Sequence, residues 1–263
     1  MGTFFFITEI SLNLLLFFLI RFWNINKFAG VGCDSFNMLL NVEAFKKKKR
    51  FPVNIGNIFM LENSKQWYPP LYVAFISIFS INFIKKNHHI INHLFDSINL
   101  ILFLFICNDN SFSFEQKIIL TCIYASSIGI INEFHSLNVR PIGLVIFNFS
   151  IFGLLFFELN EIIYWIWIPG VILFYTHKFS FQALIYVYLI FSIFVDIKYF
   201  LFLLFIISLS FLIWPEGFIK LSKAHFNILL FWKKNWNKKG SHIIRESIFY
   251  NDKKTRNGFY DQK

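Results

Sequence analysis

The chain has 263 residues, of which 56% are hydrophobic and 15% are charged, and its formal net charge is +10. A soluble domain of this length cannot cover its surface with so few polar groups, because apolar usage averages roughly 45–50%. The composition therefore argues against a soluble domain and predicts an integral membrane protein. Phenylalanine supplies 39 residues, but a bilayer accepts Phe as readily as Leu, so this richness does not by itself indicate aromatic chemistry.

The basic residues gather in two regions, 46–50 and 233–256, which both lie close to apolar segments. In a soluble protein, a positive charge can indicate a nucleic acid partner. Beside apolar segments it favours anionic lipid headgroups instead. We therefore expect anionic lipids and no nucleic acid among the partners.

The first apolar run ends near residue 22 and contains Glu9. It lacks a basic start and a small-residue cleavage site, so we interpret it as a retained helix over residues 4–23 rather than a cleaved signal peptide. A long polar loop, 24–69, follows this helix. Long polar loops in membrane proteins tend to carry function.

A short apolar segment, 71–84, follows Pro69-Pro70, and it is shorter than the roughly 20 residues that a spanning helix needs. Further predicted spans cover residues 90–107, 118–131, 142–157, 162–175, 181–195 and 199–214.

The predicted fold class is all-α: a polytopic membrane protein of about seven or eight transmembrane helices. Its long first extracytoplasmic loop contains surface helices. We divide the chain into a transmembrane domain, 1–214, and a segment, 215–263, that combines an amphipathic surface helix with a basic polar tail.

The number of spans decides which loops share a membrane face. With seven spans, the loop that carries Glu133, His135 and Arg140 lies on the face of the first loop. With eight spans, the loop around Asp109 lies there instead. Both topologies remain open from the sequence.

The first loop contains an acid, Asp34, close to the end of the first predicted span. The apolar pattern of the residues that follow it suits a helix lying along the membrane face. Asp34 alone is typical of a helix N-cap. Likewise, Trp67-Tyr68-Pro69-Pro70-Leu71 alone predicts only a helix start, because proline is tolerated in a first turn.

Taken together in this order, the elements resemble the GT-C class of membrane glycosyltransferases, which use dolichyl- or polyprenyl-phosphate sugars. The segment Asp34-Ser35-Phe36-Asn37-Met38-Leu39-Leu40 is similar to the family's Asp-Ser-Phe-Tyr-His-Leu-Leu version. Arg140-Pro141-Ile142-Gly143-Leu144 resembles an Arg-Pro-Leu-Gly-Leu element of some members. The resemblance covers about residues 1–160. The Tyr-His of the motif is Asn37-Met38 here, and the chain is short for the class.

This resemblance implies transfer of a sugar from a polyprenyl-phosphate donor to a glycan, lipid or protein acceptor at the outer membrane face. A carboxylate can activate the acceptor hydroxyl as a general base, and Asp34 matches the family's first-loop acid. The leaving phosphate needs positive charge or a metal. We expect Arg140, His135 and Tyr68 to bind the donor phosphate, and Arg140 can do so bidentately.

A divalent cation, Mg²⁺ or Mn²⁺, is a possible cofactor, and Asp109 is its candidate ligand in the eight-span topology. Structural interpretations compete here, since Asp favours turns and Arg140 suits an interface anchor. Glu43 and Glu133 are further candidate acids. The histidines at 88, 89 and 93 lack the acid of a zinc protease motif.

Two other function classes compete with the enzyme: a non-catalytic membrane subunit and a small transporter. Transporters place ionisable groups near the bilayer midplane, and the predicted spans carry few of them, Asp96 being the main exception. This pattern disfavours the transporter. The short length and the missing Tyr-His keep the non-catalytic subunit as an alternative to the enzyme. We expect an integral membrane location, in a bacterial plasma membrane.

Overall fold

The computed structural model describes residues 2–25, 33–51, 69–127, 131, 134–156 and 167–240, and regular structure within them is helical. The helices are α1 (Gly2–Ile25), α2 (Cys33–Lys48), α3 (Pro70–Ile76), α4 (Ile81–Asp109), α5 (Phe114–Ser126), α7 (Arg140–Phe156), α9 (Trp167–Phe174), α10 (Lys178–Phe194), α11 (Lys198–Ile213) and α12 (Pro215–Gly240). The expectation of an all-α chain is confirmed for these residues.

The chain forms two compact units, Met1–Phe218 and Ile219–Lys263. The second unit is described for residues 219–240, which belong to α12. Exposed Phe226, Leu229 and Leu230 alternate there with basic residues such as Lys223. The remaining description concerns the first unit.

Several helix boundaries follow from local chemistry. Proline at the first helical position needs no N–H partner, and α3 begins at Pro70. The Ser80 hydroxyl accepts a hydrogen bond from the Phe83 amide and caps α4. Ser113 and Gln116 form a reciprocal capping box at the start of α5.

On two helices, several polar side chains lie inside the bundle while large apolar ones lie outside it. On α1, Glu9, Asn13 and Arg21 are buried, whereas Leu19 and Trp23 are 61% and 78% exposed. A helix on the surface of a soluble protein shows the opposite arrangement.

The same inversion recurs on α5. Lys117 and Thr121 are buried there, while Ile119 and Ile123 are 57% and 62% exposed. Helix surfaces of this kind suit apolar surroundings.

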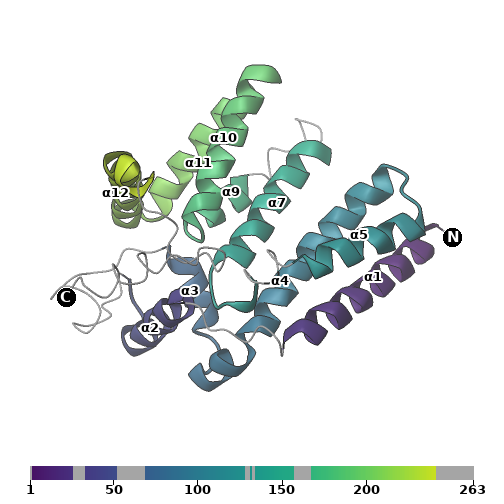
Figure 1. Cartoon of the computed structure of the whole chain (residues 1–263). Coiled ribbons are helices and arrows are strands. Elements are labelled where there is room, and N and C mark those ends of the chain that lie inside the picture. Colours follow the sequence, from purple (N-terminus) through teal and green to yellow (C-terminus); the bar gives the residue numbers. More distant parts are fainter. Residues whose placement is uncertain are drawn as a thin grey trace. The chain divides into compact units, whose positions relative to one another are not determined.

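The polar face of α1 pairs with α4 and α5, and the three helices lie side by side (Figure 1). Lys117 Nζ lies 2.8 Å from Glu9 Oε2. Arg21 Nη2 lies 2.7 Å from Asp96 Oδ2. Between these ion pairs, the Thr121 hydroxyl donates a 2.7 Å hydrogen bond to Asn13 Oδ1.

These contacts fix the directions of the helices. Residue numbers rise together in the pairs Glu9–Lys117 and Asn13–Thr121, so α1 and α5 are parallel. The pairs Phe6–Phe105 and Arg21–Asp96 run in opposite order, so α4 is antiparallel to α1.

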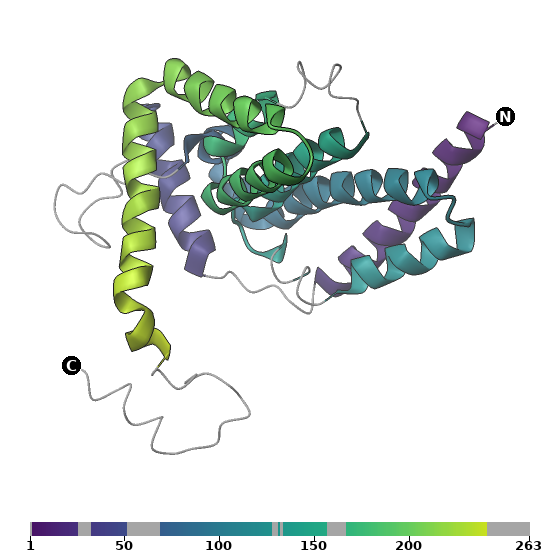
Figure 2. The same cartoon turned by 90° about the horizontal axis from the view of Figure 1, so that it is seen from above.

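Along the chain, α1, α4 and α5 thus alternate in direction, and the remaining helices, drawn in Figure 2, do the same. Asn148 bonds Asn99 and Phe152 contacts Phe105, so α7 runs parallel to α4. The chain leaves α9 beside the start of α7, where His177 contacts Gly143.

Helix α11 runs parallel to α9, since Trp167 contacts Phe205 and the Tyr175 hydroxyl donates to the Ser210 carbonyl. Helices α1, α5, α9 and α11 therefore run one way, and α4, α7 and α10 run the other.

By length and composition, two of the described helices, Phe5–Trp23 and Ile81–Asp109, are long and apolar enough to cross a membrane. The core helix of a soluble protein or a signal sequence meets the same criterion. Shorter apolar helices cover Arg140–Leu154, Lys178–Phe194 and Lys198–Ile213. The segment at 71–84 is divided between the seven-residue α3 and the start of α4, and α3 packs against α2.

We predict that replacing Lys117 with Met destabilises the fold, because it leaves the Glu9 carboxylate buried without its cation. Breaking a buried pair costs about 3–5 kcal/mol. The double variant Glu9→Leu with Lys117→Met should recover most of that loss. The measurement is the free energy of unfolding in nanodiscs.

The exposed pair Lys198–Asp196, at 3.9 Å, supplies a control. Lys198→Met should cost less than about 1 kcal/mol, as surface pairs do. Equal losses for Lys117→Met and Lys198→Met would contradict a stabilising role for the buried pair.

Candidate anion-binding site

A cavity of about 240 Å³ lies in the first unit and is lined by cations, amides and a few apolar side chains. The lining residues are Asn37, Met38, Asn41, Asn138, Val139, Arg140, His177, Lys178 and Phe179.

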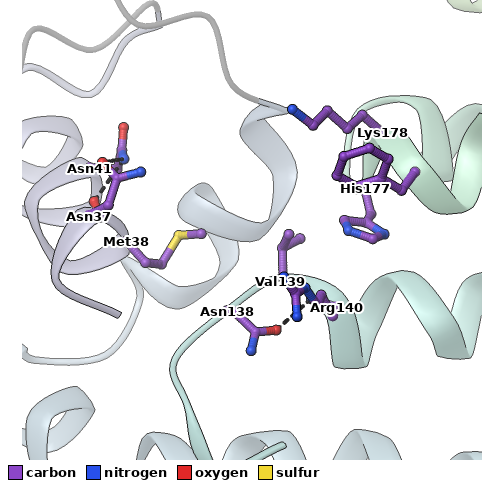
Figure 3. A pocket seen from close by; sticks show the side chains of 9 residues that line it. Asn37, Met38, Asn41, Asn138, Val139, Arg140, His177 and Lys178 are labelled. Atoms are coloured by element: carbon purple, nitrogen blue, oxygen red, sulfur yellow. Dashed lines mark hydrogen bonds between the residues drawn. The ribbon is translucent and has the colours of Figure 1, made fainter. Parts of the chain in front are cut away.

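Three parts of the chain meet at this cavity (Figure 3). Helix α2 supplies two asparagines, and the segment before α7 supplies Asn138. The turn between α9 and α10 supplies His177 and Lys178. Arg140 and Lys178 are the first residues of α7 and α10, two helices of 17 residues each. The cavity therefore lies at two helix N-termini, where partial positive charge favours anions.

The two cations add full charges to this site. The Arg140 guanidinium can hold a phosphate through two parallel hydrogen bonds. Lys178 is partly buried at the start of α10. An anion in the cavity would favour the charged form of Lys178. The described lining contains no carboxylate, and the charges that it carries on Arg140 and Lys178 are positive.

Buried polar contacts hold the segment that presents Arg140. The Asn92 side-chain amide donates to the carbonyls of Phe134 and Ser136, at 3.1 and 2.7 Å. The Leu137 amide donates to the Ser35 hydroxyl of α2 at 2.8 Å.

At the end of this segment, Asn138 Oδ1 accepts the Arg140 amide at 2.8 Å. Helices α2 and α4 thus fix the backbone that leads to the guanidinium.

Asp34, the predicted base, is the second residue of α2, the helix whose Asn37 and Asn41 line the cavity. The side chain of Asp34 lies outside the described part of the structure. Arg140, the predicted phosphate ligand, lines the cavity together with α2. The structure therefore places α2, the helix that contains Asp34, and Arg140 at the same cavity.

His135 does not line the cavity. It is 6% exposed, and its ring lies 5.2 Å from that of His93. Burial, and then the charge of Arg21, lowers the pKa of His135 to about 4. At neutral pH this imidazole is therefore uncharged and offers no cation to a phosphate. Tyr68 and Glu133 lie outside the described residues.

Asp109 ends α4, next to Asn108, whose Oδ1 accepts a hydrogen bond from Lys117. Because Lys117 also binds Glu9, this end of α4 lies beside the first half of α1. The cavity lies with the opposite end of the bundle, where α4 begins. Asp109 is therefore not brought to the helix of Asp34, and Glu43 is a partly exposed residue of α2 outside the cavity lining.

Sequence reasoning missed Lys178, His177 and the three asparagines. One signal was available: His177-Lys178 separates two predicted apolar spans, and such polar breaks lie at a membrane face. Asparagines within α2 gave no such signal, because the residues outside α2 that line the cavity lie about 100 or more residues further along the chain.

We predict that Gly143→Ala weakens anion binding at this cavity. A Cβ at Gly143 would lie 2.5 Å from His177 Cβ, so His177 must shift. Gly170→Ala is the matched control, because its Cβ would meet the movable end of Ile206, at 2.7 Å, away from the cavity lining. Phosphate-lipid affinity, measured by native mass spectrometry, should fall several-fold only for Gly143→Ala. Equal affinities in the two variants would contradict a role for His177 in shaping the site.

Comparison with known protein families, with curated proteins and with solved structures finds no match for this chain.

Proposed function

We propose that the protein is an integral membrane glycosyltransferase that takes a sugar from a polyprenyl-phosphate donor. The observation that carries the proposal is the cavity in which Arg140 and Lys178 meet the helix that begins at Cys33-Asp34. The sugar-transfer chemistry comes from the resemblance to GT-C enzymes, and the phosphate chemistry comes from the geometry of the cavity.

The inverted polarity of the helices supports the membrane location. Helices that bury Glu9, Arg21 and Lys117 while exposing leucine, isoleucine and phenylalanine are matched to lipid rather than water. The described helices α1, α4, α5, α7, α9, α10 and α11 alternate in direction, and we propose that each belongs to a segment of the chain that crosses the bilayer. In this seven-span topology, α2 and α3 lie at the same face as the cavity.

The cavity residues suggest how the reaction is divided among groups. Arg140, Lys178 and the two helix N-termini would hold the donor phosphate and stabilise the charge that develops on it as the glycosidic bond breaks. Asp34 would remove the proton from the acceptor hydroxyl.

The described residues do not fit a divalent cation at this site. The lining offers two cations and amides, and no group of three or more metal-ligating side chains occurs in the described part of the chain. We therefore assign no step to Mg²⁺ or Mn²⁺, and Asp109 has no place in the proposed site.

We predict saturable binding of one polyprenyl-phosphate sugar in native mass spectrometry of the purified protein. Arg140→Gln and Lys178→Gln should each weaken that binding at least about tenfold, because each removes one charge-assisted contact with the phosphate, worth about 1.5–3 kcal/mol. Asp34→Asn should bind the donor but not release polyprenyl phosphate over time.

Asp109→Asn is the control, with unchanged binding and turnover. Equal affinity for plain phospholipid and for every sugar lipid would refute the enzyme and favour a non-catalytic membrane subunit.

The side of the membrane gives a further prediction. The resemblance assigns the cavity to the outer face, whereas the basic residues 46–50, which end and follow α2, favour the cytoplasmic face by the positive-inside tendency. Lys48→Cys in a background without other cysteines should react with an impermeant maleimide on intact cells. Reaction only after permeabilisation would place the cavity inside and contradict transfer at the outer face.

A further inference from the structure

A second polar cluster lies between α1, α4 and α5. It shares no residue with the lining of the cavity that contains Arg140 and Lys178. Arg21 of α1 and both His93 and Asp96 of α4 have side chains that are fully buried. Tyr124 of α5 and His135, from the segment before α7, complete the cluster. Ionisable groups inside the helices of a membrane protein commonly mark a functional site.

The carboxylate of Asp96 is fully engaged in this cluster. One oxygen accepts Arg21 Nη2 at 2.7 Å, and the other accepts the Tyr124 hydroxyl. The rings of Phe17 and Tyr124 lie 5.2 and 5.8 Å from the guanidinium carbon of Arg21 and cover it. The guanidinium is thus held in place by one carboxylate and two rings.

Four nitrogens of Arg21 and His93 lack a hydrogen-bond partner among the residues that the structure describes. They are Nε and Nη1 of Arg21 and both ring nitrogens of His93, all of them buried. Native proteins leave few buried polar groups unpaired, and those that occur often mark a bound water or ion.

The two side chains face the same region. His93 lies three residues before Asp96, the partner of Arg21, on one face of α4. The His93 ring lies 6.3 Å from that of Phe22, the neighbour of Arg21. Arg21 also acts electrostatically on His93.

We propose that Arg21 and His93 bind a small monovalent anion, such as a halide, and that His93 takes up a proton with it. The unpartnered groups are mostly donors: one N–H on Nε, two on Nη1 and one on neutral His93. A ligand that accepts hydrogen bonds fits them best.

Charge balance explains why His93 takes up a proton when the anion binds. The charges of Arg21 and Asp96 cancel, so an anion alone would leave a buried uncompensated charge. One proton on His93 cancels the charge of the anion and turns both ring nitrogens into donors. The groups around His93 are Asp96 and His89 on α4, Arg21 on α1, His135 before α7, and Tyr124 through Asp96.

The experiment uses the full chain in nanodiscs of neutral phosphatidylcholine. Sodium bromide replaces sodium gluconate at constant ionic strength, and the unfolding midpoint is followed at pH 6 and pH 8. Bromide should raise the midpoint, and its apparent affinity should fall about tenfold per pH unit, since one proton binds with each anion. In crystals soaked in bromide, an anomalous peak should lie against Arg21 and His93.

Two variants and one control test the assignment. His93→Gln keeps a donor but cannot be protonated, so bromide binding should weaken and lose its pH dependence. Arg21→Lys keeps a cation for Asp96 but removes the guanidinium donors, so it should fold and bind bromide at least tenfold more weakly. His89→Gln, one helical turn away at a half-buried position, should behave as the wild type.

Three results would overturn the proposal. Equal midpoints in bromide and gluconate at both pH values would do so, as would density for ordered water only beside Arg21 and His93. A bromide effect that keeps its full pH dependence in His93→Gln would also do so, because another group would then supply the proton.

Discussion

The arrangement of the first unit depends on the contacts that join the polar face of α1 to α4 and α5. In lipid, apolar side chains gain little from helix association, so helices associate through polar contacts and close packing. The Glu9–Lys117 pair provides such a contact in the first half of α1, and the Arg21–Asp96 pair provides one near its end. Phe17, Leu100, Leu104 and Ala125 form a small apolar cluster at this interface. Two buried ion pairs and a small apolar cluster therefore hold the three helices together.

This organisation places the cavity at one end of the bundle. Because α4 is antiparallel to α1, the end of α1, the start of α4 and the start of α7 lie together. The cluster of Met38, Val42, Tyr72 and Ile84 packs α2 and α3 there. Rigid helix ends and buried hydrogen bonds from Asn92 then hold the backbone next to Arg140. Preformed positive charge at this end of the bundle is consistent with the phosphate recognition that we propose.

Hydropathy and proline placement allowed much of the fold to be predicted from the sequence. Apolar runs identified the region of each described helix from α4 to α11, and Pro69-Pro70 correctly marked the start of α3. The pairing of charges within the bundle could not be predicted in this way. Glu9 and Arg21 are isolated in an apolar run, and their partners lie 108 and 75 residues further along the chain. For the same reason, Arg140 could be proposed from its motif, whereas Lys178 required knowledge of how α9 and α10 turn back on α7.

The long separation of these partners has a consequence for biosynthesis. Arg21 leaves the ribosome 75 residues before Asp96, which corresponds to roughly 4–15 s at about 5–20 residues per second. In the proposed membrane topology, the charged groups of α1 have no partner during that interval, and lipid does not solvate them. The insertion of α1 thus depends on a protected, partly hydrated environment at the translocation machinery until α4 and α5 arrive. Nascent chains that stop before Asp96 should therefore remain bound to that machinery instead of entering the lipid phase.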